Sequence, residues 1–314
     1  MGNLMSKKKF QITIFCAILI GIFGYASSVY AQGGAGTTAS DEKVWHNDPY
    51  FRTWMNSISD SAKLSDLSIP GTHETMTAGV KGGLGYAQNQ SLSLSDQLDN
   101  GIRFIDIRAR YIDGVFTIHH GDYYTHSNLG DVFVGVLKFL QAYPSETVLM
   151  RLKQEKSDLG DDRLNQEFKK YFDRYNDIIW KNNSGTSNPT LGEIRGKVVI
   201  LRNFNGSLNE NIGLKYPGNM DIQDQYEDMR AGSKKSAVDA QLRAAAAGKD
   251  NGKIYINYLS FTGNWLTNWK NAQDLNPHTF DYIRANIKWH CGIVVSDYPG
   301  GALIWEIVGR NFGW

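Results

Sequence analysis

The strongest constraint on the fold is the recurrence of short strand-like segments along the chain. They lie near residues 66–70, 103–108, 115–120, 147–153, 197–203, 222–226, 254–260 and 292–297. Helical patterns separate several of them, and strands that alternate with helices form a mostly parallel sheet. We therefore predict an α/β fold, a single irregular (β/α)8-type TIM barrel with its active site at the C-terminal ends of the strands.

Two helices carry their own boundary signals. The alanine-rich segment 240–247 stops at Gly248, a residue type that favours helix C-termini. Asn276 and Pro277 are residue types preferred at a helix cap and at the first helical position. We predict that a helix begins there and runs to about Trp289.

The first 31 residues resemble a secretory signal peptide, because three lysines precede an apolar run and small residues follow it. An uncleaved membrane anchor is the alternative. Residues 32–44 are small and polar and are predicted to form a disordered lead-in. Residues 45–314 then form one barrel domain of a secreted, extracellular protein, which we expect to be a monomer.

The exported chain is close to neutral. Removing the signal lysines leaves 30 basic against 32 acidic side chains. This balance argues against nucleic acid as a partner and against attraction to anionic membranes by bulk charge alone. Cys291 is then the sole cysteine, so the exported chain cannot form an intrachain disulfide.

Two predicted strands have charges on one face. Asp106 and Arg108 alternate with isoleucines, and Lys153 and Glu155 follow the same pattern in the segment 147–155. If these faces point into the barrel, the charges must be paired or must bind a ligand.

Two histidines, His73 and His120, end further strands, so they and Arg108 should meet at the rim of the barrel. One imidazole could accept a proton and the other donate one, while the guanidinium holds phosphate oxygens. This set of groups suits phosphoryl transfer without a metal.

Six motifs resemble those of bacterial phosphatidylinositol-specific phospholipase C, in the same order, from about Trp45 to Val308. They are Ser-Ile-Pro-Gly-Thr-His (68–73), Phe-Ile-Asp-Ile-Arg-Ala-Arg (104–110), Ile-His-His-Gly (118–121), Pro-Ser-Glu-Thr (144–147) with Leu-Lys-Gln-Glu (152–155), Arg-Gly-Lys-Val-Val-Ile (195–200) and Val-Ser-Asp-Tyr (295–298). The resemblance implies an irregular barrel that cleaves phosphatidylinositol to diacylglycerol and inositol 1,2-cyclic phosphate, with slower hydrolysis of the cyclic ester and no cofactor.

The resemblance also implies roles for the catalytic residues. His73 is the expected general base for the inositol 2-hydroxyl, and Asp297 orients its imidazole. His120 is the expected general acid for the leaving oxygen of diacylglycerol. Calcium-dependent lipases of similar fold have a carboxylate ligand where Arg108 stands, and a guanidinium repels a dication. We therefore predict no metal; the alternative role of Arg108 is an internal salt bridge to Asp106 or Glu74.

Inositol specificity should come from polar residues in the pocket. By resemblance these are Lys153, Glu155, Asp224, Tyr226 and Arg202. Tyr226 would stack on the inositol ring.

The chain departs from the family at two positions. Glu74 replaces the usual Asp, and its expected role is to partner Arg108 and the acid histidine. Asn203 stands where the family has an inositol-binding arginine, and Arg202 is one position early. A one-residue shift in a strand reverses the face, so Arg202 reaches the pocket only if a bulge intervenes.

Segment 261–270 resembles the interfacial aromatic rim of the family. We predict that Trp265, Leu266 and Trp269 contact the membrane, with a smaller contact at 82–86. Alternatively, the tryptophans cover the barrel.

The expected partners are phosphatidylinositol, glycosylphosphatidylinositol lipids and a membrane surface that is bound transiently. A different phosphodiesterase and a catalytically weak inositol-lipid-binding barrel remain as alternative functions.

Overall fold

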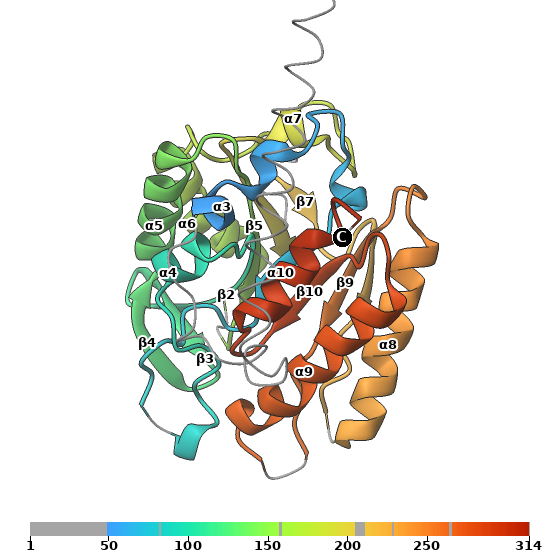
Figure 1. Ribbon diagram of the computed structural model, residues 1–314. Coiled ribbons are helices and arrows are strands. Elements are labelled where there is room, and N and C mark those ends of the chain that lie inside the picture. Colours follow the sequence, from blue (N-terminus) through green and yellow to red (C-terminus); the bar gives the residue numbers. More distant parts are fainter. Residues whose placement is uncertain are drawn as a thin grey trace, which may run out of the picture.

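A curled, mostly parallel sheet forms the centre of the computed structural model, which describes residues 49–313 except 82, 157–158, 205–210, 228 and 264–265 (Figure 1). The predicted signal peptide and lead-in lie outside these residues. The strands are β1 (Ile69–Thr72), β2 (Phe104–Ile112), β3 (Val115–His120), β4 (Tyr123–Asn128), β5 (Val148–Gln154), β6 (Val198–Asn203), β7 (Leu214–Lys215), β8 (Met220–Gln223), β9 (Ile254–Tyr258) and β10 (Ile293–Ser296).

The order of the sheet is β7-β6-β5-β2-β1-β10-β9-β8, and each neighbouring pair along it is parallel. An antiparallel hairpin of β3 and β4 extends from β2. The α/β fold and the irregular TIM-like barrel are therefore confirmed. Among the residues that the structure describes, the hydrogen-bonded order begins at β7 and ends at β8, so these strands form a curled sheet with two edges and not a closed ring.

Helices cover the outside of this sheet. α8 packs against β8 and β9, α10 against β1, and α5 against the β3–β4 hairpin (Figure 1). The helices are α3 (Pro49–Arg52), α4 (Leu94–Asp99), α5 (Leu129–Ala142), α6 (Asp161–Arg174), α7 (Leu191–Ile194), α8 (Ala231–Ala247), α9 (Asn268–Asn286) and α10 (Gly301–Gly309), with short 3-10 turns η2 (Trp54–Ser57), η3 (Leu64–Asp66) and η4 (Gly83–Gly85). None of the described helices is both long enough and apolar enough to cross a bilayer.

The predicted start of a helix at Asn276 and Pro277 is wrong. α9 begins nine residues earlier than Pro277, after Thr267, whose side chain accepts a hydrogen bond from the backbone N–H of Lys270. Pro277 lies inside the helix. The amide of Asn276 is buried and donates to the carbonyls of Asp297 and Tyr298, so it connects α9 to the end of β10 and does not cap a helix.

Strand boundaries also differ from the prediction at several places. The segment predicted at 66–70 forms β1 only from Ile69, because 64–66 form a 3-10 turn. The segment predicted at 222–226 ends as β8 at Gln223. β4 and β7 were not predicted: β4 is polar in sequence and largely exposed, and β7 has two residues.

A buried ion pair lies at the end of the barrel opposite the strand C-termini. Arg103, just before β2, and Glu146, before β5, both have fully buried side chains. The guanidinium donates two hydrogen bonds to Glu146 Oε2, at 3.0 and 2.9 Å, and others to the carbonyls of Leu98, Ile102, Phe51 and Arg52. The Arg103 guanidinium thus connects the segments before β2 and β5 to the end of α3.

We predict that Glu146→Ala lowers the free energy of unfolding by about 3–5 kcal/mol, because it leaves the Arg103 charge buried without its counterion. Chemical denaturation measures the change. Asp173→Asn, which breaks the exposed Lys169–Asp173 pair on α6, is the control and should cost less than about 1 kcal/mol. Equal effects of the two variants would contradict this role of Glu146.

Candidate active site

Three parallel strands and the antiparallel strand β3 bring charged and polar side chains to one place. His73 follows β1, Arg108 lies on β2, His120 ends β3 and Asp297 follows β10. In register, Asp106 of β2 lies beside Arg151 of β5, and Arg108 lies beside Lys153. The charged faces that period-two alternation predicted for these two strands are therefore neighbours.

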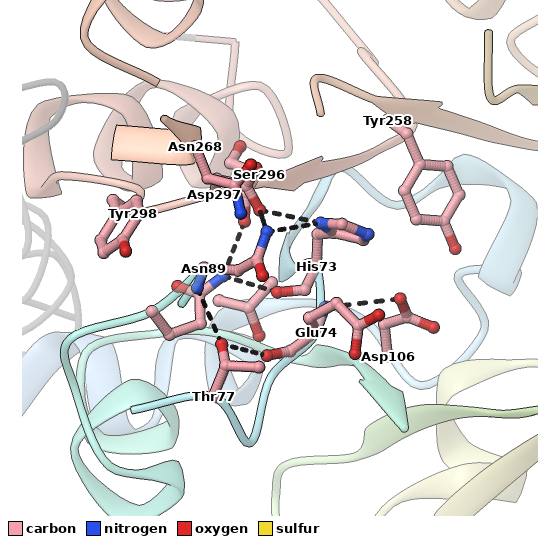
Figure 2. A network of polar contacts seen from close by, with 12 residues as sticks. His73, Glu74, Thr77, Asn89, Asp106, Tyr258, Asn268, Ser296, Asp297 and Tyr298 are labelled. Atoms are coloured by element: carbon pink, nitrogen blue, oxygen red, sulfur yellow. Dashed lines mark hydrogen bonds and ion pairs between the residues drawn. The ribbon is translucent and has the colours of Figure 1, made fainter. Parts of the chain in front are cut away.

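His73 is held between the carboxylate of Asp297, which Figure 2 shows beside the imidazole, and the guanidinium of Arg108. Its Nδ1 lies 2.8 Å from Asp297 Oδ1, and its Nε2 lies 2.9 Å from Arg108 Nη2. A guanidinium can only donate, so Nε2 must accept, and the ring hydrogen is therefore on Nδ1 and is donated to Asp297. This tautomer presents a basic lone pair toward the centre of the site.

Arg108 bridges two buried carboxylates. Its Nη1 is 2.7 Å from Glu74 Oε1, and its Nη2 is 3.2 Å from Asp106 Oδ2. Both internal salt bridges considered as the alternative role of this arginine are therefore formed, together with the contact to His73. The backbone of Glu74 has φ of 46°, in the left-handed region that non-glycine residues rarely adopt.

The two carboxylates around this guanidinium titrate very differently. Burial raises the pKa of Glu74 to about 7, even though Arg108 opposes the shift. Burial also acts to raise the pKa of Asp106, but Arg108 and Arg151 outweigh it and hold that pKa well below its usual range. Asp106 is therefore the permanent counterion of Arg108, whereas Glu74 can gain or lose a proton near neutrality.

His120 approaches the same carboxylate from the other side. Its Nε2 lies 4.0 Å from Glu74 Oε1, and its Nδ1 lies 3.1 Å from the carbonyl oxygen of Ala87. A carbonyl only accepts, so Nδ1 is protonated and Nε2 faces the site. Burial lowers the pKa of His120, although the contact with Ala87 acts to raise it.

Arg151 shares the inward face of Lys153 on β5, but it was not among the site residues expected from the sequence. Its guanidinium donates to Tyr258 Oη at 2.9 Å, to Asn203 Oδ1 at 3.0 Å and to Asp106 Oδ1 at 3.4 Å. The ring of Tyr258 also lies edge-on to that of His73, at 6.3 Å between centroids. The charged inward face of β5 was the signal that could have assigned Arg151 to the site.

Comparisons with known proteins place this arrangement in a family. Residues 61–204 match the family described as phosphatidylinositol-specific phospholipase C, X domain. The chain is 31% identical to the 1-phosphatidylinositol phosphodiesterase of Listeria monocytogenes, over 96% of each chain. The chain belongs to the phosphatidylinositol-specific phospholipase C X-domain family.

Other members of the family are similar to this chain over most of its length. A 1-phosphatidylinositol phosphodiesterase of Staphylococcus aureus is 26% identical, over 93% of this chain and 94% of its own. The solved phosphatidylinositol-specific phospholipase C of Listeria monocytogenes superposes with a TM-score of 0.73 at 29% identity, covering 83% of this chain and 98% of its own. The expected membership of the phospholipase C family is therefore confirmed.

The residues expected to bind substrate in this phospholipase C family member do not all share one face. Lys153 and Glu155 pair at 3.5 Å at the end of β5, and Asp224 and Tyr226 follow β8, with Tyr226 47% exposed. The β5–β6 register continues without a shift through Leu152↔Arg202 and Lys153↔Asn203.

This register corrects the expectation for Arg202. Without a bulge, strand alternation puts Asn203 on the inward face, where it accepts from Arg151, and Arg202 on the opposite face. Asn203 therefore occupies the inward position beside Lys153, and Arg202 is not proposed as a substrate contact.

The predicted membrane residues have different environments. Leu266 is half exposed, at 50%, just before α9. Trp269 is partly buried, and its ring packs edge-on against Tyr298 at 5.1 Å between centroids. Trp265 lies outside the described residues. Of the two described residues of this set, Leu266 therefore has the larger exposed fraction.

The pKa of Glu74 predicts a pH-dependent stability. Its folded-state pKa of about 7 exceeds the ordinary value of 4.5, so the folded chain holds a proton there that the unfolded chain has released between these values. The free energy of unfolding should therefore fall, relative to that of Glu74→Gln, as the pH rises from about 4.5 to about 7. Chemical denaturation of both proteins at each pH measures the difference. Groups that titrate alike in both proteins cancel, and a difference that stays constant with pH would contradict the raised pKa.

Proposed function

We propose that this protein is a metal-independent phospholipase C that cleaves phosphatidylinositol to diacylglycerol and inositol 1,2-cyclic phosphate. One observation carries the proposal. His73 Nε2 touches one nitrogen of Arg108, and His120 Nε2 faces Glu74, which touches another nitrogen of the same guanidinium. A proton acceptor and a proton donor thus flank the cation that binds a phosphate.

In the first step, His73 Nε2 takes the proton of the inositol 2-hydroxyl. The 2-oxygen forms a bond to phosphorus, and the bond from phosphorus to the glycerol oxygen breaks. His120 Nε2–H protonates that oxygen, so diacylglycerol leaves neutral. Arg108 exchanges its contact with His73 for the phosphate oxygens, and Asp297 stabilises the imidazolium that forms. Hydrolysis of the cyclic ester uses the two histidines in exchanged roles and is slower.

The acid role requires His120 to be protonated. Burial lowers its pKa in the free protein, and the negative charge of a bound phosphodiester raises it again. Glu74 adds to this effect when it is ionised, because Oε1 lies 4.0 Å from the ring. Substrate binding therefore favours the protonated form of His120, which is the form that the reaction requires.

The position of Arg108 supports metal independence. Its guanidinium lies between Glu74 and Asp106, within 2.7 and 3.2 Å of their oxygens. These are the carboxylates that a divalent cation would otherwise use, and the arginine supplies the positive charge for the phosphate itself.

The remaining residues give the reaction its setting. Lys153, Glu155 and Asp224 bind the inositol hydroxyls, and Tyr226 stacks on the inositol ring. Phosphatidylinositol and glycosylphosphatidylinositol lipids share this headgroup, so the same contacts serve both. Leu266 and Trp269 contact the membrane surface. The signal-like residues 1–31 support export of the enzyme and an extracellular site of action.

Phosphorus NMR of the reaction with phosphatidylinositol tests the proposal. In excess chelator, the protein should produce a cyclic phosphodiester signal that later converts to the monoester. His73→Ala and His120→Ala should each lower the rate by roughly 10²–10⁴. Activity that disappears with chelator and returns with a divalent cation would indicate a metal-dependent phosphodiesterase, and binding without turnover would indicate a lipid-binding barrel.

A substrate with an acidic phenol as leaving group separates the two histidines. Such a group leaves without protonation, so His120→Ala should lose much less activity on it than on phosphatidylinositol. His73→Ala should lose about as much on both substrates, because the attacking hydroxyl is the same. Equal losses for His120→Ala on both substrates would exclude it as the acid.

The membrane contact predicts a separable defect. Leu266→Asp should weaken binding to phosphatidylinositol vesicles, measured by sedimentation, because a charge replaces an exposed apolar side chain. Hydrolysis of soluble inositol cyclic phosphate should change less than about twofold. Trp289→Ala is a matched control, since this side chain is 44% exposed but follows α9 at the opposite end of the barrel. Equal loss of vesicle binding in both variants would contradict the predicted site of membrane contact.

A further inference from the structure

Asn89 contacts the proposed base, with its Nδ2 3.2 Å from His73 Nδ1, and also contacts the carboxylate partner of that base (Figure 2). Its side chain is buried, with 1% of the residue exposed, and Nδ2 lies 2.9 Å from Asp297 Oδ1. A carboxylate only accepts hydrogen bonds, so the amide nitrogen and not the oxygen must face it. The same Oδ1 accepts from His73 Nδ1 at 2.8 Å. One oxygen of Asp297 thus receives hydrogens from both side chains.

The backbone of Asn89 is fixed to both strand ends that carry this pair. Its N–H donates to Thr77 Oγ1 at 2.9 Å, and this hydroxyl donates to the carbonyl of Glu74 at 2.8 Å. Its carbonyl accepts from the N–H of Tyr298 at 3.0 Å. The residue is therefore anchored next to His73 on one side and next to Asp297 on the other.

The rest of segment 86–90 strengthens this anchoring. Gln90 Nε2 donates to the carbonyls of His73 and Ser296, at 2.7 and 3.0 Å. The carbonyl of Ala87 faces His120 Nδ1. The amide of Asn268, at the start of α9, donates to the carbonyls of Tyr86 and Gln88. Segment 86–90 thus connects the base, the acid and α9.

We propose that Asn89 is a positioning residue of the reaction. Its amide holds Asp297 Oδ1 toward His73 Nδ1, and this keeps the imidazole in the tautomer and orientation that present Nε2 to the 2-hydroxyl. The residue touches no reacting atom and acts through Asp297 and through Nδ1 of His73, the ring nitrogen that faces away from the substrate. This inference rests on the proposed function, in which His73 is the base.

Asn89→Asp separates positioning from mere space filling, because the two side chains have nearly the same shape. In this variant two carboxylates face each other, and repulsion raises the pKa at which one of them binds a proton. While it is protonated, Asp at this position donates an O–H to Asp297, as the amide does. Once it is ionised, it repels Asp297. The other charged and titratable groups that face this place are His73, Glu74, Arg108, His120 and Lys234 of α8, and none of them is altered by the substitution.

Steady-state kinetics as a function of pH test the inference. Asn89→Ala should lower kcat by roughly tenfold to a hundredfold and change KM less than about twofold. The kcat of Asn89→Asp relative to the wild type should fall as the pH rises. In a His73→Ala background, Asn89→Ala should cost little more, because the group it orients is gone. Thermal unfolding of each variant verifies that it is folded.

Asn268→Ala is the matched control, since it loosens the same segment without touching His73 or Asp297. Its kcat relative to the wild type should not vary with pH. The inference is overturned if Asn89→Ala retains kcat within about twofold of the wild type, or if the relative kcat of Asn89→Asp does not change with pH.

A proton NMR signal separates this inference from the proposed function. The His73 Nδ1 hydrogen should give a slowly exchanging signal in the wild type that is lost in Asn89→Ala and retained in Asn268→Ala. A wild-type protein that retains this pattern but forms no cyclic phosphate would overturn the proposed function and leave the positioning role intact. A signal unchanged in Asn89→Ala would overturn the positioning role, whatever the activity.

Discussion

The arrangement of the site depends on the Arg108 guanidinium. It is buried among Asp106 of its own strand β2 and Glu74 and His73, which follow β1, so its contacts join the ends of these two neighbouring strands. A cation with so little contact with water needs a fixed negative partner, and Asp106 supplies it because two arginines hold its pKa low. With that charge matched, Glu74 and the imidazole of His73 remain available for proton chemistry.

Buried charges are also paired with one another along the inward faces of β2 and β5. Arg151 matches the second oxygen of Asp106 and also donates to Tyr258 and Asn203. Together with the buried pair of Arg103 and Glu146, these contacts replace part of the apolar interior that a barrel usually has. The contacts of Arg151 and Asp106 make the interior polar near the strand C-termini, and the Arg103–Glu146 pair makes it polar at the opposite end.

Those residues that lie on regular strands could be predicted from the sequence, because period-two alternation fixes which side chains share a face. Arg108, Lys153 and His120 are of this kind, and the register of β6 decided between Arg202 and Asn203. Residues with tertiary partners could not be predicted. The pair Asn276–Pro277 is typical of a helix start, but both residues lie inside α9. The Asn276 amide donates instead to the carbonyls of Asp297 and Tyr298, just after β10. Asn89 lies in an irregular segment, and its role depends on contacts more than 200 residues away in the chain.

The pairing of β1 with β10 means that His73 meets Asp297 only across 224 positions of sequence. A partly synthesised chain that ends before β10 has the imidazole but lacks its carboxylate. The pair that we propose for catalysis therefore forms only once β10 has joined β1, so a chain that lacks its last strand holds His73 without the group that orients it.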